Sequence, residues 1–157
     1  MRVLGLDPGT ATTGYGVVEG KGSRLHHIAH GVITTPPEMH FADRLKYIHE
    51  ACAALLIEHR PDAVAIERLY FKQNVTTGIT VAQARGVLAL AAAQAGLPIG
   101  EFSPTEAKTA ITGYGKADKK QVQEMIKLLL NLDAIPRPDD AADALGIAIC
   151  LIHAGLR

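Results

Sequence analysis

Two short apolar runs in this chain each end in a carboxylate. The run Val3 to Leu6 ends at Asp7 and is followed by a Pro-Gly pair, a pattern that predicts a buried strand. The run 63–66 ends in the same way at Glu67. Open α/β sheets bind their ligands at the carboxyl ends of strands, so both acids are candidate site residues. Asp-Pro-Gly is also ordinary turn chemistry, which leaves a purely structural role open for Asp7.

Two further acids, Asp140 and Asp143, fall in the first turns of the last predicted helix. Residues three apart lie on one helix face. Asp139 and Asp140 also suit the N-cap and the positive end of the helix dipole, which is the structural alternative. Asp143 is followed by a long apolar stretch and shares its face with apolar residues. A carboxylate there is costly unless a metal ion or a basic side chain pairs with it, and both explanations are open.

Together the four carboxylates would form an all-oxygen ligand set, which hard cations such as Mg²⁺ or Mn²⁺ prefer. Crowded like charges raise the pKa of some of these carboxyl groups until a metal ion arrives. Carboxylates that bridge two ions suit phosphodiester hydrolysis, because one ion activates water and the other stabilises the leaving oxygen. The expected chemistry is metal-dependent cleavage of a phosphodiester, with two ions at the site.

The hydrophobic pattern predicts the elements that position these acids. Strands are expected at 3–7, 14–19, 25–34, 63–67 and 97–102, and helices at 39–59, 75–95, 103–113, 118–130 and 139–153. Short turns favour an antiparallel meander for the first three strands, and helix 39–59 is long enough to cross over to a parallel strand. This order predicts an α/β fold, a mixed five-stranded sheet flanked by helices on both faces. Asp7 and Glu67 would then end neighbouring strands about 4.8 Å apart.

Composition sets outer bounds on the protein. At 157 residues, with 48% hydrophobic and 20% charged residues, we expect one globular domain over residues 1–157. The net charge of zero favours no class of partner. No run of 18 apolar residues is present, so we expect no membrane span, and the N-terminus is expected to be a strand and not a signal peptide. Cys52 and Cys150 form no CxxC motif and are expected to be buried thiols in a reducing, cytoplasmic environment.

A polar loop after Glu67 carries aromatic and basic residues side by side. Tyr70 and Phe71 lie between Arg68 and Lys72, in a chain that has only four Tyr and three Phe. Such interleaving suits stacking on unpaired or distorted bases. The alternative is that one or both rings fold back into the core.

Five lysines and two acids lie between positions 108 and 127. A solvated helix face explains most charge runs of this kind. The functional alternative is phosphate binding, for which the candidates are Lys108, Lys116, Lys119 and Lys120.

Two other features bear on partners. The helix Gly78–Ala95 is apolar on nearly all sides beyond Arg85, so a second side must be covered, either by a partner chain or by helix 39–59. His27 and His30 are three apart on a predicted strand, where their side chains would face opposite sides, and no metal site is predicted there.

Five short motifs occur along the chain: LGLDPGT at 4–10, GYG at 14–16, AIE at 65–67, QARG at 83–86 and DAADAL at 140–145. In their order and spacing these motifs resemble the RuvC family of Holliday junction resolvases. The resemblance runs from Arg2 to about His153 and implies a ribonuclease H-like fold. It implies a homodimeric endonuclease that nicks two opposing strands of a four-way DNA junction symmetrically and works with the branch-migration proteins RuvA and RuvB. It also implies that the catalytic metal ligands are Asp7, Glu67, Asp140 and Asp143.

The same resemblance suggests roles for the loop and the lysines. Tyr70 matches an aromatic residue that wedges into the junction, where relatives carry Phe, and Phe71 could share that role. Lys108 and Lys119 correspond to lysines near the catalytic centre, whereas the family varies at Lys116.

Three other functions compete with this one. An actin-like phosphotransferase also opens with a strand, an Asp and a Gly-Thr turn, but it needs two such domains and a much longer chain. A DNA-binding module without activity gains nothing from four acids, because they repel phosphates. Another ribonuclease H-like nuclease is the realistic alternative, and the substrate would distinguish it.

Overall fold

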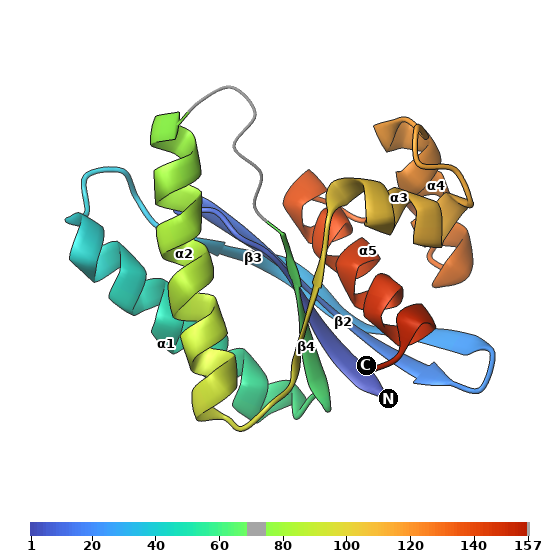
Figure 1. Ribbon diagram of the computed structural model, residues 1–157, viewed down its shortest axis with the longest axis horizontal. Helices are drawn as coiled ribbons and strands as arrows, with labels where there is room; N and C mark the ends of the chain where they lie inside the picture. Colours follow the sequence, from blue (N-terminus) through green and yellow to red (C-terminus); the bar gives the residue numbers. More distant parts are fainter. Residues whose placement is uncertain (69–74, 157) are drawn as a thin grey trace.

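The protein, described here by a computed structural model of residues 1–68 and 75–156, is built on one five-stranded sheet (Figure 1). Its strands are β1 (Arg2–Asp7), β2 (Thr12–Lys21), β3 (Arg24–Thr34), β4 (Ala63–Glu67) and β5 (Ile99–Phe102). The spatial order is β3-β2-β1-β4-β5. The first three strands form an antiparallel meander, whereas β4 runs parallel to β1 and β5 runs parallel to β4. The predicted mixed sheet is therefore confirmed.

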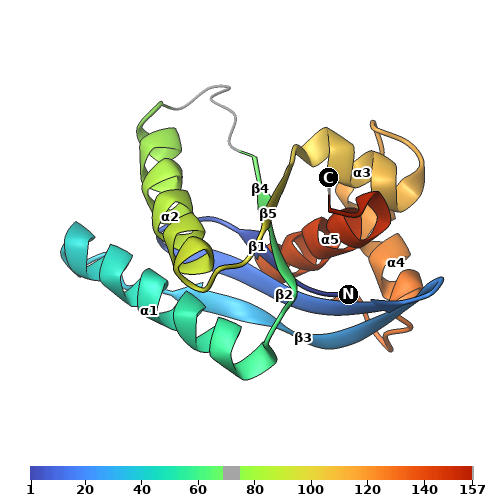
Figure 2. The ribbon, with the colours of Figure 1, turned by 60° about the horizontal axis from the view of Figure 1, so that its bottom comes forward.

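Helices cover both faces of the sheet, as expected. They are α1 (Phe41–His59), α2 (Val75–Gln94), α3 (Pro104–Thr112), α4 (Lys119–Leu129) and α5 (Asp139–Ala154). Figures 1 and 2 show α1 and α2 on one face and the other three helices on the opposite face. Each layer has its own apolar cluster, one including Cys52 and the other centred on the buried residues of α5. Both cysteines are buried and free, as predicted.

The helix starts near the site show where local sequence signals succeed and where one fails. Ser103 and Glu106 form the predicted capping box of α3, with Pro104 at its first position. The predicted N-cap role of Asp139 or Asp140 is wrong, because α5 begins at Asp139 after Pro138 and has no side-chain cap. The Asp139 carboxylate is instead occupied by side chains of α4 and of the preceding loop.

Glycines on the sheet let α5 pack directly against the backbone of β1 and β2. A Cβ atom at Gly14 would overlap the carbonyl oxygen of Asp140, and one at Gly5 would overlap that of Ala144. Gly16 faces Leu145 in the same way. Because no side chain separates the layers here, the first turn of α5 comes close to the end of β1, where Asp7 lies.

A bulge in β3 overturns the prediction for the two histidines. Val17 of β2 pairs with Ala29 and Val18 pairs with His27, so Ile28 is an extra residue in β3. The extra residue changes the alternation of side chains and brings His27 and His30 to one face. Their Nε2 and Nδ1 atoms are 2.7 Å apart and hydrogen-bonded. Among the described residues no third metal-ligating side chain joins this pair.

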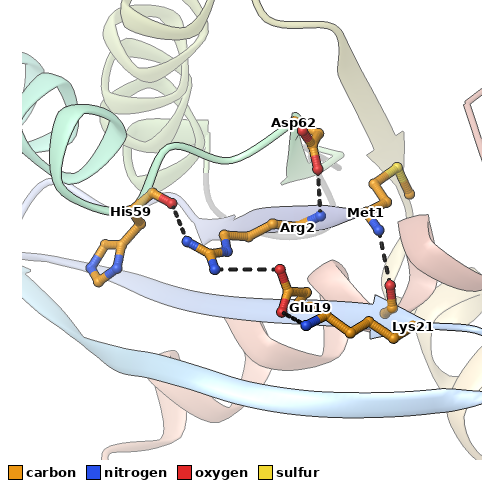
Figure 3. A network of polar contacts seen from close by, with 7 residues as sticks. Met1, Arg2, Glu19, Lys21, His59 and Asp62 are labelled. Atoms are coloured by element: carbon orange, nitrogen blue, oxygen red, sulfur yellow. Dashed lines mark hydrogen bonds and ion pairs between the residues drawn. The ribbon is translucent and has the colours of Figure 1, made fainter.

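The end of the sheet away from Asp7 is held by polar contacts of Arg2 (Figure 3). Its guanidinium donates to the carbonyl oxygen of His59 at the end of α1, at 2.8 Å, and pairs with Glu19 of β2 at 3.3 Å. Its backbone N–H donates to the Asp62 carboxylate just before β4. These contacts tie β1 to both of its neighbouring strands.

Helix α2 packs one of its sides into the core and is tied to the sheet by an ion pair. Its buried side contributes Ala84, Leu88 and neighbouring alanines to the cluster shared with α1. Arg85 pairs with Glu101 of β5. Among the described helices α2 alone has the length and apolar composition to cross a membrane, a test that core helices of soluble proteins also pass.

Candidate metal centre and nucleic-acid interface

Three carboxylates meet where β1 ends and α5 begins. One ligand oxygen each from Asp7, Asp140 and Asp143 lies within 4.8 Å of the others, and all three residues are half-buried. The parallel register of β1 and β4 pairs Leu6 with Ile66, which puts Glu67 beside Asp7 as predicted. Glu67 is outside the group of three but shares a hydrogen bond with Asp7. Among residues 1–68 and 75–156 this is the only group of three or more such side chains with metal-binding geometry.

The electrostatics of the cluster favour the arrival of a cation. Burial, followed by the neighbouring Glu67 carboxylate, raises the pKa of Asp7 to about 9. Burial also raises the pKa of Asp143 to about 6, although the Lys119 ammonium opposes this shift. These carboxyl groups therefore hold protons more readily than isolated ones, and a divalent cation would compete with those protons. An all-oxygen site of crowded carboxylates fits a hard metal ion, whose charge relieves their mutual repulsion.

The turn after Asp7 is fixed by buried threonines. The Thr13 hydroxyl donates to the carbonyl oxygen of Gly9 at 2.6 Å, and Thr13 is fully buried. The Thr35 hydroxyl donates to the Thr10 carbonyl oxygen at 2.6 Å and accepts from Nε of Arg44 at 2.8 Å. Sequence reasoning missed Thr13, Thr35 and Arg44, because nothing in their spacing marks them as partners of the turn.

The same turn also contacts α2, the helix for which the sequence suggested a partner chain. The Thr10 hydroxyl donates to the backbone carbonyl oxygen of Thr80 at 3.0 Å. The position of the turn is therefore linked to that of α2.

Two of the predicted lysines lie beside the acids. A pocket of about 220 Å³ is lined by the charged residues Glu67, Asp143, Lys108 and Lys119 and by apolar residues of α3, α4 and α5. Lys116 and Lys120 are exposed and do not line this pocket. The structure thus brings Lys108 and Lys119 to the carboxylates and leaves the other two lysines on the surface.

Lys119 pairs with Asp139, an acid that the sequence suggested as a helix N-cap. Its ammonium lies 3.0 Å from Oδ2 of Asp139, which also receives Arg137 and Gln123 on its other oxygen. The hydrogen bond from Lys119 lowers the pKa of Asp139, and the same bond raises the pKa of Lys119. Asp139 is thus an ionised carboxylate directed at α4.

The predicted DNA-binding loop is described only at its start. The Arg68 guanidinium lies 3.7 Å from the Glu106 carboxylate and donates to the Glu101 carbonyl oxygen at 3.4 Å. The Arg68 side chain therefore lies beside β5 and α3 and is partly exposed. Tyr70, Phe71 and Lys72 lie outside the described residues.

The sheet order, with acids at the carboxyl end of its central strands and on the helix packed over them, defines a ribonuclease H-like, metal-dependent nuclease. Residues 3–151 match the family model for the crossover junction endodeoxyribonuclease RuvC. A protein of that name from Thermosipho melanesiensis is 56% identical over 151 residues, which cover 96% of each chain. One from Brevibacillus brevis is 54% identical over 157 residues, 100% of this chain and 93% of the relative. The chain belongs to the RuvC family of crossover junction endodeoxyribonucleases, which are hydrolases.

Solved structures agree with this assignment. The Thermus thermophilus RuvC structure is 36% identical with a TM-score of 0.90, covering 97% of this chain and 93% of the other. The same protein in complex with a Holliday junction substrate gives 35% identity and a TM-score of 0.93 over the same shares. A yeast mitochondrial Holliday junction resolvase, 16% identical with a TM-score of 0.69 over 94% of this chain and 77% of its own, shares the fold.

Proposed function

We propose that this chain resolves Holliday junctions by nicking two opposing strands symmetrically, in homologous recombination and DNA repair. The observation that carries the proposal is the meeting of Asp7, Asp140 and Asp143, with Glu67 beside them. The relatives at more than half identity are named for this activity, and the structure of the Thermus thermophilus protein contains a junction substrate. The whole chain, residues 1–157, acts as one RuvC-type nuclease domain in the cytoplasm.

The four acids Asp7, Glu67, Asp140 and Asp143 are the proposed catalytic metal ligands. Their oxygen-only donor set fits Mg²⁺, with Mn²⁺ as a substitute, and its number of carboxylates fits two ions. When bound, the ions would activate water and stabilise the leaving oxygen. The protein itself holds the Asp-Pro-Gly-Thr turn still through Thr13, so that the scissile phosphate has a fixed place.

Basic residues around the pocket are the proposed phosphate contacts. Lys108 and Lys119 line the same pocket as Glu67 and Asp143, where an ammonium can offset the charge of a phosphate. Lys116 and Lys120 are exposed and lie outside this pocket, and we propose that they contact DNA further out. Arg68 continues this surface toward the loop that carries Tyr70, Phe71 and Lys72, which we propose to be the junction wedge and its flanking charge.

The proposed homodimer forms through α2, over the range Gly78–Ala95. Helix α1 covers part of α2, as the alternative prediction required, yet α2 keeps an exposed stripe at Ile79, Gln83, Gly86, Leu90 and Ala93. Ile79 is 51% exposed and Leu90 is 50% exposed. Contiguous exposed apolar residues of this kind mark interaction sites. A twofold dimer would place two active sites for two strands, and RuvA and RuvB are the proposed further partners.

The test compares substrates under one set of conditions with Mg²⁺. We expect paired nicks in a four-way junction at a rate at least tenfold above that for linear duplex or an RNA–DNA hybrid of the same sequence. Asp133→Asn, a change at an exposed acid that is not part of the cluster, should cleave like the wild type. Preferential cleavage of the hybrid would instead support a different ribonuclease H-like nuclease.

A further inference from the structure

Asp139, the first residue of α5, is an acid in addition to the four proposed metal ligands. Other protein side chains contact both oxygens of its carboxylate. Its Oδ2 lies 3.0 Å from the Lys119 ammonium. Its Oδ1 accepts from Nε2 of Gln123 at 3.2 Å and from Nη1 of Arg137 at 3.3 Å. Gln123 is buried, with 7% exposed, so this contact anchors the carboxylate against the inner side of α4. Asp139 is not one of the three acids whose oxygens converge.

The partner of Asp139 stands at the edge of the carboxylate cluster. Lys119 is the first residue of α4, whose start is fixed by the Asp118 capping box. Asp139 and Asp143 are four residues apart and so lie on one face of α5. Lys119 and Asp143 line the same pocket together with Glu67. The contact with Asp139 therefore holds the ammonium over the face of α5 that leads to the cluster.

We propose that Asp139 is a positioning residue that holds the Lys119 ammonium beside the carboxylate cluster, where negative charge builds up on the phosphodiester during cleavage. This inference rests on the proposed function of the cluster. A cation that is already in place stabilises the transition state without reorganisation at the moment of reaction. A lysine side chain is long and flexible, so without a fixed partner its ammonium would spend much of its time away from the phosphate. Asp139 acts through Lys119 and is not one of the acids whose oxygens converge.

The test is a double-mutant cycle on single-turnover cleavage of a four-way junction at saturating protein, with Asp139→Asn, Lys119→Ala and the double variant. Asn keeps the size of the side chain and can still accept from Gln123, and the ion pair is half-exposed, so the fold should persist. We expect Lys119→Ala to lower the rate at least tenfold and Asp139→Asn to lower it three- to tenfold. The double variant should match Lys119→Ala alone. Equal losses from Asp139→Asn in both backgrounds, or no loss in the wild-type background, would overturn the proposal.

Three further measurements separate this proposal from general damage to the protein and from failure of the proposed function. Asp133→Asn removes one charge from the same segment and should leave the rate unchanged, and junction affinity without divalent cation should change less than threefold in Asp139→Asn. Limited acetylation read by mass spectrometry should label Lys119 faster in Asp139→Asn, relative to Lys120 in the same molecule. That readout needs no nuclease activity. Unchanged labelling would show that Asp139 does not hold Lys119, even if no junction is cleaved.

Discussion

Asp7 has a more strongly raised pKa than Asp143, the other carboxyl group of the cluster whose pKa is clearly raised. Burial and Glu67 raise the pKa of its carboxyl group to about 9, so folding favours the protonated form. A carboxyl group whose pKa is raised by folding stabilises the folded protein at pH values below its pKa in the unfolded chain, about 4. This stabilisation is lost as the pH rises through the pKa of the group in the folded protein. Without divalent cation the free energy of unfolding should therefore fall between roughly pH 4 and pH 9 from this group.

The variant Asp7→Asn should remove that dependence. In EDTA at pH 8 we expect it to be more stable than the wild type by about 1 kcal/mol or more, since one pKa unit corresponds to about 1.4 kcal/mol. Urea unfolding at pH 5, 7 and 9, with and without Mg²⁺, would measure the effect, and Mg²⁺ should narrow the difference by stabilising the wild type alone. Parallel pH profiles for the two proteins would show that Asp7 is not protonated in the folded state.

At this scale the sequence predicts some residues and misses others for physical reasons. Asp7, Glu67 and Asp143 stand out because a carboxylate beside apolar residues needs an explanation. Asp139 does not, because an acid at a helix start already has an ordinary explanation as a cap. Only the three-dimensional contact with Lys119, twenty residues earlier in the chain, shows its other use.

At the scale of elements, the position of α5 against β1 and β2 decides whether the acids can meet. Gly14 has no room for a side chain, because a Cβ atom there would overlap the Asp140 carbonyl oxygen. The helix would have to move away from the sheet, and Asp140 and Asp143 would move with it.

We therefore predict that Gly14→Ala destabilises the protein by about 1–3 kcal/mol, as overpacking of a tight core does. It should also weaken Mg²⁺ binding at least tenfold, measured by calorimetry at a temperature where the variant is folded. Gly20→Ala is the matched control on the same strand, because it meets only the Ile152 side chain at the far end of α5. Its Mg²⁺ affinity should equal that of the wild type, and equal affinity in Gly14→Ala would contradict this account of the helix position.

The order and type of all the elements follow from periodicity, capping residues and turn lengths, and the structure confirms them. The bulge at Ile28 does not follow, because the residues from Arg24 to Thr34 read as a regular strand. Its register is set by pairing with β2, which a strand's own sequence does not encode. The two histidines were misplaced for this reason.

At the scale of the whole molecule, the exposed stripe on α2 is the surface that a second copy would cover. Thr10 links the turn after Asp7 to this helix, so in the proposed dimer the interface would be connected to the carboxylate cluster. The sequence alone did not decide whether α1 or a partner chain buries the second side of α2, because either would bury an apolar face.

We predict that Leu90→Glu shifts the protein toward monomer, since burying a Leu side chain contributes about 1.5–3 kcal/mol. Analytical ultracentrifugation should show the dissociation constant raised by roughly tenfold or more. Leu128→Glu, at an exposed leucine on α4, should leave the dimer intact. A dimer unaffected by Leu90→Glu would place the interface elsewhere.

Cleavage and binding of a four-way junction by Asp7→Asn in Mg²⁺ test most directly whether the carboxylate cluster is the nuclease site. We expect paired nicking to fall by at least a thousandfold while the junction is still bound within threefold of the wild-type affinity, because the change removes a proposed metal ligand and leaves the lysine surface untouched. Asp133→Asn should keep both properties. Full cleavage by Asp7→Asn would contradict the assignment of this cluster as the nuclease site.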